Sequence, residues 1–398
     1  MRLLLVNQPW PAFGGSETYL LTIATELERL GHDVDLYGPA TSQAIQLARE
    51  RGLRTLCAPE KLPGESQVVI TQDGESCAEM AARYPSAIRI YIAHSGPFLP
   101  QRPPQVPGAY HGIVTMNDAT CRMAEALAVT GEVIRLRQPV DLERFGDRGE
   151  PAAKLRRVLL LGNHWVPGTR DHGIVAEACK QLGLELRHVG RGGRVSRTPE
   201  TEIADVDAVV GIGRCVIEAM AMQRAAYVFG NTGVGGWITP DNYGEIEARA
   251  FTRTNHVEAI DAARLRDDLR RYDANMGYQN RHLTIAHHST RRHVAELIEL
   301  VARLEPAPVA DPTPLETVAR LVRVQWEVSA RAAIAEGESA LLRNENERLW
   351  NENGDLTGEN TALRSHLERV ISGRRYRIAQ RLGRPIDAAR ALIGRPGR

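Results

Sequence analysis

The sequence lacks several features, and each absence excludes a class of function. Basic and acidic residues balance, 50 against 49, so the chain has no overall field to attract nucleic acid. The five cysteines have no CxxC spacing, which indicates a reducing compartment and no metal knuckle. No apolar run approaches the roughly eighteen residues of a membrane-spanning helix. We therefore expect a cytoplasmic protein that binds no nucleic acid and no metal.

Short apolar runs alternate with helix-length segments through most of the chain, and 398 residues allow two domains plus an extension. The runs are residues 3–6, 34–37, 68–70, 88–92 and 112–115 in the first half, and 158–161, 186–189, 206–210 and 226–229 in the second. The alternation predicts an α/β fold of parallel sheets covered by helices on both faces. Ligands of such sheets bind at the carboxyl ends of the strands.

Two strand-to-helix turns carry glycines. The first strand is followed by a loop that ends in Gly14-Gly15, after which Ser16 is expected to cap a helix that runs to Leu30. The strand at 206–210 turns through Gly211 and Gly213 into a second helix. Glycines at a helix start let an anionic ligand approach the free N–H groups.

Glu218 lies in the first turn of that second helix. Its carboxylate would repel a phosphate but would suit a ribose with two hydroxyls. An ordinary strand-to-helix turn with a solvated glutamate is the alternative interpretation of these residues.

The segment that ends in Glu218-Ala219-Met220-Ala221 resembles the donor-binding stretch of family 4 glycosyltransferases. These are retaining enzymes of the GT-B fold, in which two Rossmann-like doubly wound domains face a cleft. The resemblance implies that Glu218 holds the ribose of a nucleotide sugar. It also implies that the turn at Gly213 and the backbone amides of Cys215, Val216 and Ile217 hold the diphosphate.

Other segments extend the resemblance. Phe13-Gly14-Gly15-Ser16-Glu17 is similar to the family's Gly-Gly-x-Glu loop, which faces the donor diphosphate and the acceptor. In the family, a histidine placed like His94 touches the donor sugar, and a loop placed like the one at Gly190 lies near the base. The glycine-rich block at 231–243 resembles a loop of enzymes that act on bacterial envelope glycans.

The chain departs from the family pattern at two positions that hold the diphosphate and at one that contacts the donor sugar. Asn163 stands where the family has Arg, and His172 stands where it has Lys. Arg170 is two residues away and has the reach to substitute in stabilising the leaving diphosphate. A further family glutamate falls at Val210, so Arg214 is the candidate contact to the donor sugar.

The domain boundaries follow from composition and from the resemblance. We expect an acceptor-side domain at 1–142, a nucleotide-sugar domain at 143–304, a Pro-rich linker at 305–313, a coiled coil at 314–372 and a basic amphipathic tail at 373–398. Polar residues with Pro and Gly between 146 and 153 complete the connection between the two domains.

A heptad repeat runs through the extension. Its a positions are Val318, Gln325, Ala332, Ser339, Asn346, Asn353, Asn360 and Leu367, and its d positions are Leu321, Val328, Ala335, Leu342, Leu349, Leu356, Leu363 and Val370. The pattern predicts a coiled coil, and successive asparagines at a favour a parallel homodimer in one register. Gly354 and Gly358 each weaken the helix by about 1 kcal/mol. The alternative is a single helix that packs its apolar a and d positions against the globular part of the chain.

The tail beyond Gly373 interleaves arginines with apolar residues, as do helices that lie on anionic membranes. The protein would then be peripheral on the inner face of the cell membrane, where a lipid-linked acceptor would be found. A solvated basic tail is the simpler alternative.

The resemblance implies a metal-independent hexosyltransferase-like enzyme. It would move a sugar from a nucleotide-sugar donor to a glycan or lipid-linked acceptor with retention, in cell-surface polysaccharide or lipopolysaccharide biosynthesis. An inactive scaffold that organises an envelope-assembly complex through its coiled coil is the main alternative, favoured by Val210, Asn163 and His172. A sugar-nucleotide epimerase is a third.

Overall fold

The structure is a computed structural model of the 398-residue chain. It describes residues 1–6, 14–96, 98–127, 131–147, 149–190, 192–194, 196, 198–230, 233–252, 260–307, 309, 313–373, 377–378 and 381. Most of the basic tail and part of the Pro-rich linker lie outside the described residues. The described chain divides into two compact units, Met1–Ala332 and Ala333–Arg398.

The first sheet has seven parallel strands in the order β3-β2-β1-β4-β5-β6-β7. They are β1 (Arg2–Val6), β2 (Asp33–Tyr37), β3 (Arg54–Leu56), β4 (Val68–Thr71), β5 (Ile88–Ala93), β6 (Gly112–Thr115) and β7 (Glu132–Arg135). The strands at its centre are buried on both faces, which explains their continuous apolar runs.

Helices cover both faces of this sheet: α1 (Gly15–Arg29), α2 (Gln43–Glu50), α3 (Gly74–Arg83), α4 (Asp118–Ala126) and, from the far end of the chain, α11 (Thr290–Arg303). Two short 3-10 turns, η1 (Pro59–Lys61) and η2 (Leu99–Gln101), lie in the connections. The expected cap of α1 is corrected: Gly14, not Ser16, is the N-cap, and the Glu17 carboxylate accepts from the Gly14 N–H (3.0 Å).

The second sheet has five strands in the order β12-β11-β10-β8-β9. They are β8 (Arg157–Leu161), β9 (Glu185–Val189), β10 (Ala208–Gly211), β11 (Ala225–Gly230) and β12 (Gly233–Trp237). The helices that follow them are α5 (Arg170–Leu182), α6 (Pro199–Ala204), α7 (Arg214–Ala221), α8 (Tyr243–Ala248), α9 (Ala262–Leu269) and α10 (Asn275–His287). The α/β class expected from the sequence is confirmed.

The glycine-rich block differs from the loop expected there. Part of it forms β12, an edge strand that pairs antiparallel with β11, with an irregularity between Val228 and Phe229. Gly235 faces Val228 so closely that an added Cβ would lie 2.8 Å from that side chain. The glycine is therefore required by packing inside the sheet.

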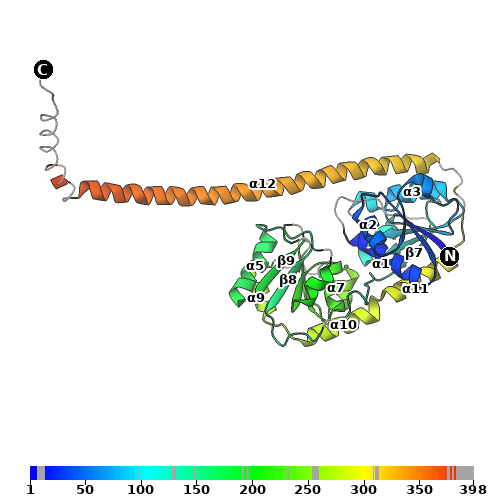
Figure 1. The fold of residues 1–398 in the computed structure, drawn as a ribbon, viewed down its shortest axis with the longest axis horizontal. Helices are drawn as coiled ribbons and strands as arrows, with labels where there is room; N and C mark the ends of the chain where they lie inside the picture. The colour runs from blue at the N-terminus through cyan, green and yellow to red at the C-terminus, as the bar shows by residue number, and fades with distance from the viewer. Residues whose placement is uncertain are drawn as a thin grey trace, which may run out of the picture. The chain divides into compact units, whose positions relative to one another are not determined.

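The first unit has two halves, the first built around the seven-stranded sheet and the second around the five-stranded sheet. Two segments of the chain cross between these halves. The connection after β7 is fastened to the junction of α10 and α11, where the Val140 N–H donates to the His288 carbonyl (2.8 Å) and the Thr290 hydroxyl donates to the Val140 carbonyl (2.8 Å). Helix α11 then returns to pack beside α1, and its Leu297 and Leu300 belong to the core under the first sheet (Figure 1).

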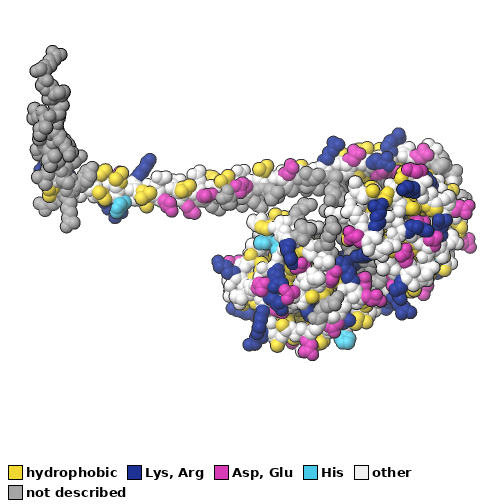
Figure 2. Space-filling view, viewed as in Figure 1, with side chains coloured by type: hydrophobic (Ala, Val, Ile, Leu, Met, Phe, Trp, Pro, Cys, Tyr) yellow, Lys and Arg dark blue, Asp and Glu magenta, His cyan; other side chains and the backbone are white. Residues whose placement is uncertain are grey.

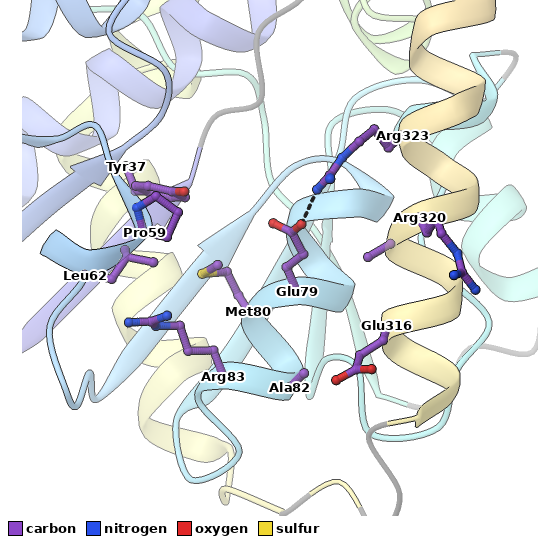
Figure 3. Close-up of a pocket in the computed structure, with 11 residues that line it drawn as sticks. Tyr37, Pro59, Leu62, Glu79, Met80, Ala82, Arg83, Glu316, Arg320 and Arg323 are labelled. Carbon is purple, nitrogen blue, oxygen red and sulfur yellow. Dashed lines mark hydrogen bonds and ion pairs between the residues drawn. The ribbon is translucent and has the colours of Figure 1, made fainter.

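Helix α12 (Thr313–Ser372) begins as part of the first unit. Leu315 is fully buried beside Tyr91 and Tyr110, and Trp326 packs edge-on against Phe98 with ring centroids 5.2 Å apart. Arg323 makes ion pairs with Glu75 and Glu79 of α3, as Figure 3 shows for Glu79. The first turns therefore pack on the body, as in the single-helix alternative, through a stripe that differs from the heptad stripe.

The second unit contains the remaining turns of α12, through Ser372. Its described d positions face solvent, with Leu342 67% and Leu363 66% exposed. Figure 2 shows apolar side chains repeated along this helix. The expected helix is thus present, and within this unit its apolar stripe is uncovered.

Candidate functional site

A cavity of about 570 Å³ opens where the carboxyl ends of strands from both sheets meet. Its lining comes from the start of α1, from α2, from the ends of β8 and β9 and from α7. The residues are Gly14, Gly15, Thr18, Gln43, Gln46, Leu47, Arg51, Arg144, Leu161, Gly162, Asn163, Val189, Gly190, Ser196, Pro199, Arg214 and Glu218. Six residues singled out from the sequence therefore line one cavity: Gly14, Gly15, Asn163, Gly190, Arg214 and Glu218.

Glycines shape the strand ends around this cavity. A Cβ on Gly190 would lie 2.2 Å from the Gly162 carbonyl oxygen, and one on Gly211 would lie 2.5 Å from the Cys215 sulfur. Gly15 has open space around its missing Cβ, so backbone is accessible there. The glycines after β9 and β10 are thus needed for folding, whereas Gly15 leaves room for a ligand.

Helix α7 begins directly at the end of β10. Only Ile212 and Gly213 separate them, and Gly213 has a φ of +69°, which favours glycine. One turn into the helix, Glu218 accepts a hydrogen bond from Arg214 Nε at 2.9 Å. Burial raises the pKa of the Glu218 carboxyl, while the Arg214 and Arg144 guanidiniums act in the opposite direction.

Arg214 also connects the two halves. Its guanidinium donates to the Pro139 carbonyl (3.1 Å) and to the Thr22 hydroxyl of α1 (3.2 Å). Burial is the main cause of its lowered pKa, which the Glu218 carboxylate opposes. Arg214 therefore fixes Glu218 and at the same time holds the second half against α1.

His94 lies at the end of β5, outside the cavity lining. Its Nε2 donates to Gln72 Oε1 (2.9 Å), and its ring meets Tyr19 edge-on at 5.1 Å. The Tyr19 hydroxyl in turn contacts His293 Nε2 at 2.9 Å. Burial, together with the charge of Arg214, lowers the pKa of His94 to about 3, so the ring is neutral at physiological pH.

The other two basic candidates also lie outside the cavity lining. Arg170 begins α5 and donates to the Ile260 carbonyl (3.2 Å). The ring of His172 lies tilted against that of His188, with centroids 5.4 Å apart, and burial lowers the pKa of His172. Of the three positions expected to grip phosphate, only the uncharged Asn163 lines the cavity.

The first turn of α7 is buried. Cys215, Val216 and Ile217 do not line the cavity, and the Val216 N–H already donates to the Gly213 carbonyl (3.1 Å). Burial raises the pKa of the Cys215 thiol to about 12, which keeps it protonated.

Position 210 proves to be a core position. Val210 is buried inside β10 between Leu160 and Tyr227. Val210 does not line the cavity.

Sequence reasoning missed the contribution of α2. Gln43, Gln46, Leu47 and Arg51 follow helical spacing and present one face to the cavity. Arg144 was also missed, although it lies in the segment that connects the two sheets. It donates to Glu200 (2.8 Å) and lies over the Phe145 ring at 5.0 Å.

A second cavity of about 560 Å³ lies between α3 and the start of α12 (Figure 3). Tyr37, Leu62 and Met80 form its apolar floor, and charges of both signs surround it. The Arg320 guanidinium points away from the space in Figure 3, and Arg323 is held by Glu79. The residues singled out from the sequence line the first cavity and not this one, so the first cavity is the candidate site.

Three observations concern the described residues as a whole. No three or more His, Cys, Asp or Glu side chains among them are grouped as ligands for a metal ion. None of their helices is both long and apolar enough to cross a bilayer. Figure 2 shows basic and acidic side chains intermixed over one face of the globular part.

Two doubly wound sheets whose strand ends meet at one cavity define the GT-B fold. Solved structures with this fold include a glycosyltransferase from Rickettsia africae (TM-score 0.52, 12% identity, 75% of this chain and 97% of that one). HepE of Anabaena, in complex with UDP, is similar at TM-score 0.53 and 12% identity, over 76% of this chain and all of that one.

TarM of S. aureus, in a complex that includes UDP, has a TM-score of 0.52 and 9% identity, over 76% of this chain and 100% of that one. No protein-family model and no curated protein sequence matches the chain. The GT-B fold expected from the sequence is confirmed.

Proposed function

We propose that this protein transfers a sugar from a nucleotide-sugar donor to a glycan or lipid-linked acceptor. The observation that carries the proposal is the cavity at which Glu218, Gly190 and the Gly14-Gly15 turn converge from two sheets. The complexes of HepE with UDP and with UDP-glucose support a nucleotide-sugar ligand in this fold. The proposed setting is bacterial cell-surface polysaccharide biosynthesis.

Within this proposal, Glu218 accepts from the ribose hydroxyls, Gly190 lies toward the base, and Asn163 occupies the position that holds the diphosphate in the family. The turn at Gly14 and Gly15 faces the diphosphate. His94 contacts the Tyr19 ring and orients the residues near the sugar through that contact. Arg170, His172 and the amides of Cys215, Val216 and Ile217 would reach a ligand only after local rearrangement.

The proposed chemistry is front-face transfer with retention. The bond between the sugar's anomeric carbon and the diphosphate oxygen breaks, and the acceptor oxygen bonds to the same face of that carbon. The leaving diphosphate takes the acceptor proton. Donors fixed around the departing oxygens would stabilise the charge that develops there.

The test is a panel of nucleotide sugars, with release of nucleoside diphosphate followed for the full chain and for Glu218→Gln. We expect turnover of one donor and a loss of about 10-fold or more in its affinity in the variant, because a charged acceptor to the ribose is lost. Glu177→Gln, on the exposed face of α5, is the matched control. Unchanged affinity in Glu218→Gln contradicts the assignment.

A scaffold without transferase activity is the second candidate. Asn163 and His172 favour it, because neither supplies a fixed cation to a diphosphate. Binding of nucleotides without release, across donors and glycan acceptors, would favour the scaffold over the enzyme.

We further propose that the chain forms a parallel homodimer through 314–372 and contacts an anionic membrane through 373–398 on the cytoplasmic side. The exposed d stripe of α12 supports the dimer. Glu338, Glu345, Glu352 and Glu359 occupy successive g positions, and Arg364 occupies an e position. In a parallel pair, Glu359 of one chain would face Arg364 of the other.

A further inference from the structure

Three arginines line the candidate site, and two of them are engaged by carboxylates. Arg144 donates to Glu200 and Arg214 donates to Glu218. Arg51 is different, because among the described residues its side chain has no hydrogen-bond partner and no ion pair, although it is exposed to the cavity. Among the described residues that line the site, Arg51 is therefore the guanidinium available to an anion.

Arg51 comes from the first half of the unit and Glu218 from the second, and both line the cavity. Arg51 directly follows α2, and its backbone N–H is fixed by the Leu47 and Ala48 carbonyls, so the base of the side chain is held in place. Gln43 and Gln46 lie on the same face of α2. The first half thus supplies two amides and a cation to the cavity, whereas Arg214 and Glu218 of the second half are paired with each other.

The electrostatic surroundings of Arg51 favour an incoming anion. Partial burial and the Arg144 guanidinium lower the pKa of Arg51, and Arg214 adds to this effect. Asp141 and Glu200 act in the opposite direction. A bound anion would relieve the repulsion between guanidiniums that converge on one cavity.

We propose that Arg51 holds the diphosphate of the nucleotide ligand from across the cleft. The inference rests on the proposed function and identifies a cation that Asn163 and His172 do not supply. Arg170 cannot fill the role as placed, because it donates to the Ile260 carbonyl outside the cavity. A guanidinium suits the group, since its planar donors match two phosphate oxygens.

The test measures the affinity of the full chain for the uridine, guanosine, adenosine and thymidine diphosphates, and for the nucleoside and monophosphate of the tightest one. In Arg51→Gln we expect diphosphate affinity to fall about 10- to 100-fold and nucleoside affinity to remain the same. Arg51→Lys should recover part of the loss. Arg49→Gln is the matched control on the same helix, because Arg49 donates to Thr55 and Cys57 away from the cavity.

The outcomes separate this inference from the proposed function. If the unaltered chain binds a diphosphate and Arg51→Gln binds it within about twofold, the role of Arg51 is refuted and the proposed function stands. If the variant weakens nucleoside and diphosphate equally, Arg51 does not act on phosphate and the inference also fails. If the unaltered chain binds none of the four diphosphates, both proposals fall.

Discussion

Glu218 and Arg214 form an ion pair within α7 whose side chains are only 8% and 10% exposed. Removing one charge leaves the other buried without its partner, which is far more costly than removing both. This limits the variants that can report on ligand binding, because a truncated Glu218 would change folding as well as the site.

We predict that Glu218→Ala lowers the free energy of unfolding by about 3 kcal/mol, because Arg214 stays buried without its carboxylate. The double variant Arg214→Met/Glu218→Ala should lose less than the sum of the losses in Arg214→Met and Glu218→Ala. Urea denaturation of the four proteins gives the coupling energy. If the losses of unfolding free energy are additive, the hydrogen bonds from Arg214 to Pro139 and Thr22 are sufficient for the buried guanidinium.

Asp73 provides a second prediction at the scale of one residue. It is the buried N-cap of α3, and its carboxylate accepts from the Ser76 N–H (2.8 Å) and hydroxyl (2.7 Å). Burial raises the pKa of Asp73 from 3.8 to about 7, against the effect of these hydrogen bonds. The folded state thus keeps its proton to a higher pH than the unfolded state does.

Because the pKa of the folded state is the higher one, this contribution to stability is complete below about pH 4 and is lost as the pH rises toward 7. Asp73→Asn keeps an acceptor for the cap without the charge. Its stability relative to the unaltered chain should therefore increase between pH 4.5 and 7.5, by up to about 3 kcal/mol. Urea denaturation at both pH values measures this.

Asp261→Asn is the control, because Asp261 caps α9 in the same way but is exposed to water. An equal pH dependence in the two variants would show that burial of Asp73 is not the cause.

At the scale of elements, the sequence was informative wherever a strand is buried on both faces. The runs at 3–6, 88–92 and 158–161 match β1, β5 and β8 within about a residue at each end. Strand β12 was expected to be a loop, because its glycines weaken any strand signal, and the close approach of Gly235 to Val228 is visible only in the structure.

The sequence predicted the part of the candidate site that comes from motifs at the ends of strands. Glu218 and Gly190 follow strands of one sheet, so their meeting follows from topology. Gln43, Gln46 and Arg51 come from a short helix with no motif. They reach the cavity only because the two halves face each other, and sequence spacing within one half does not encode that.

The start of α12 gives a prediction at this scale. Leu315 is fully buried between the helix and the first half, whereas Val324 on the same helix is 53% exposed. Leu315→Ala should lower the free energy of unfolding of the body by about 2–4 kcal/mol. Val324→Ala should change it by less than about 0.5 kcal/mol.

Urea denaturation followed by the buried Trp165 and Trp326 measures the effect of both variants. Equal, small losses would show that α12 is only loosely attached. The same burial implies that a chain cut at 304 would expose apolar surface, so the division after Ala332 is the sounder place to separate the units.

At the scale of the whole molecule, the second unit has a stripe of leucines that no other described residue of the chain covers. A lone helix of this kind gains little from helix propensity, and most helical stability in proteins comes from packing an apolar face. Asn346, Asn353 and Asn360 lie in line with the leucines at a positions, where asparagine pairs across a parallel dimer and fixes its register.

We therefore predict that the full chain sediments as a dimer with twice the 44.0 kDa mass of one chain. Leu356→Lys/Leu363→Lys should yield monomers, because two d layers would each bury a pair of like charges. Thr361→Lys/Ser365→Lys adds the same charge at outer positions of the heptad that contains Leu363 and should leave the dimer intact. Sedimentation equilibrium distinguishes the three proteins. If the variant with lysines at d remains a dimer, the dimer interface lies elsewhere. If the unaltered chain is a monomer, the apolar stripe of α12 binds a different partner.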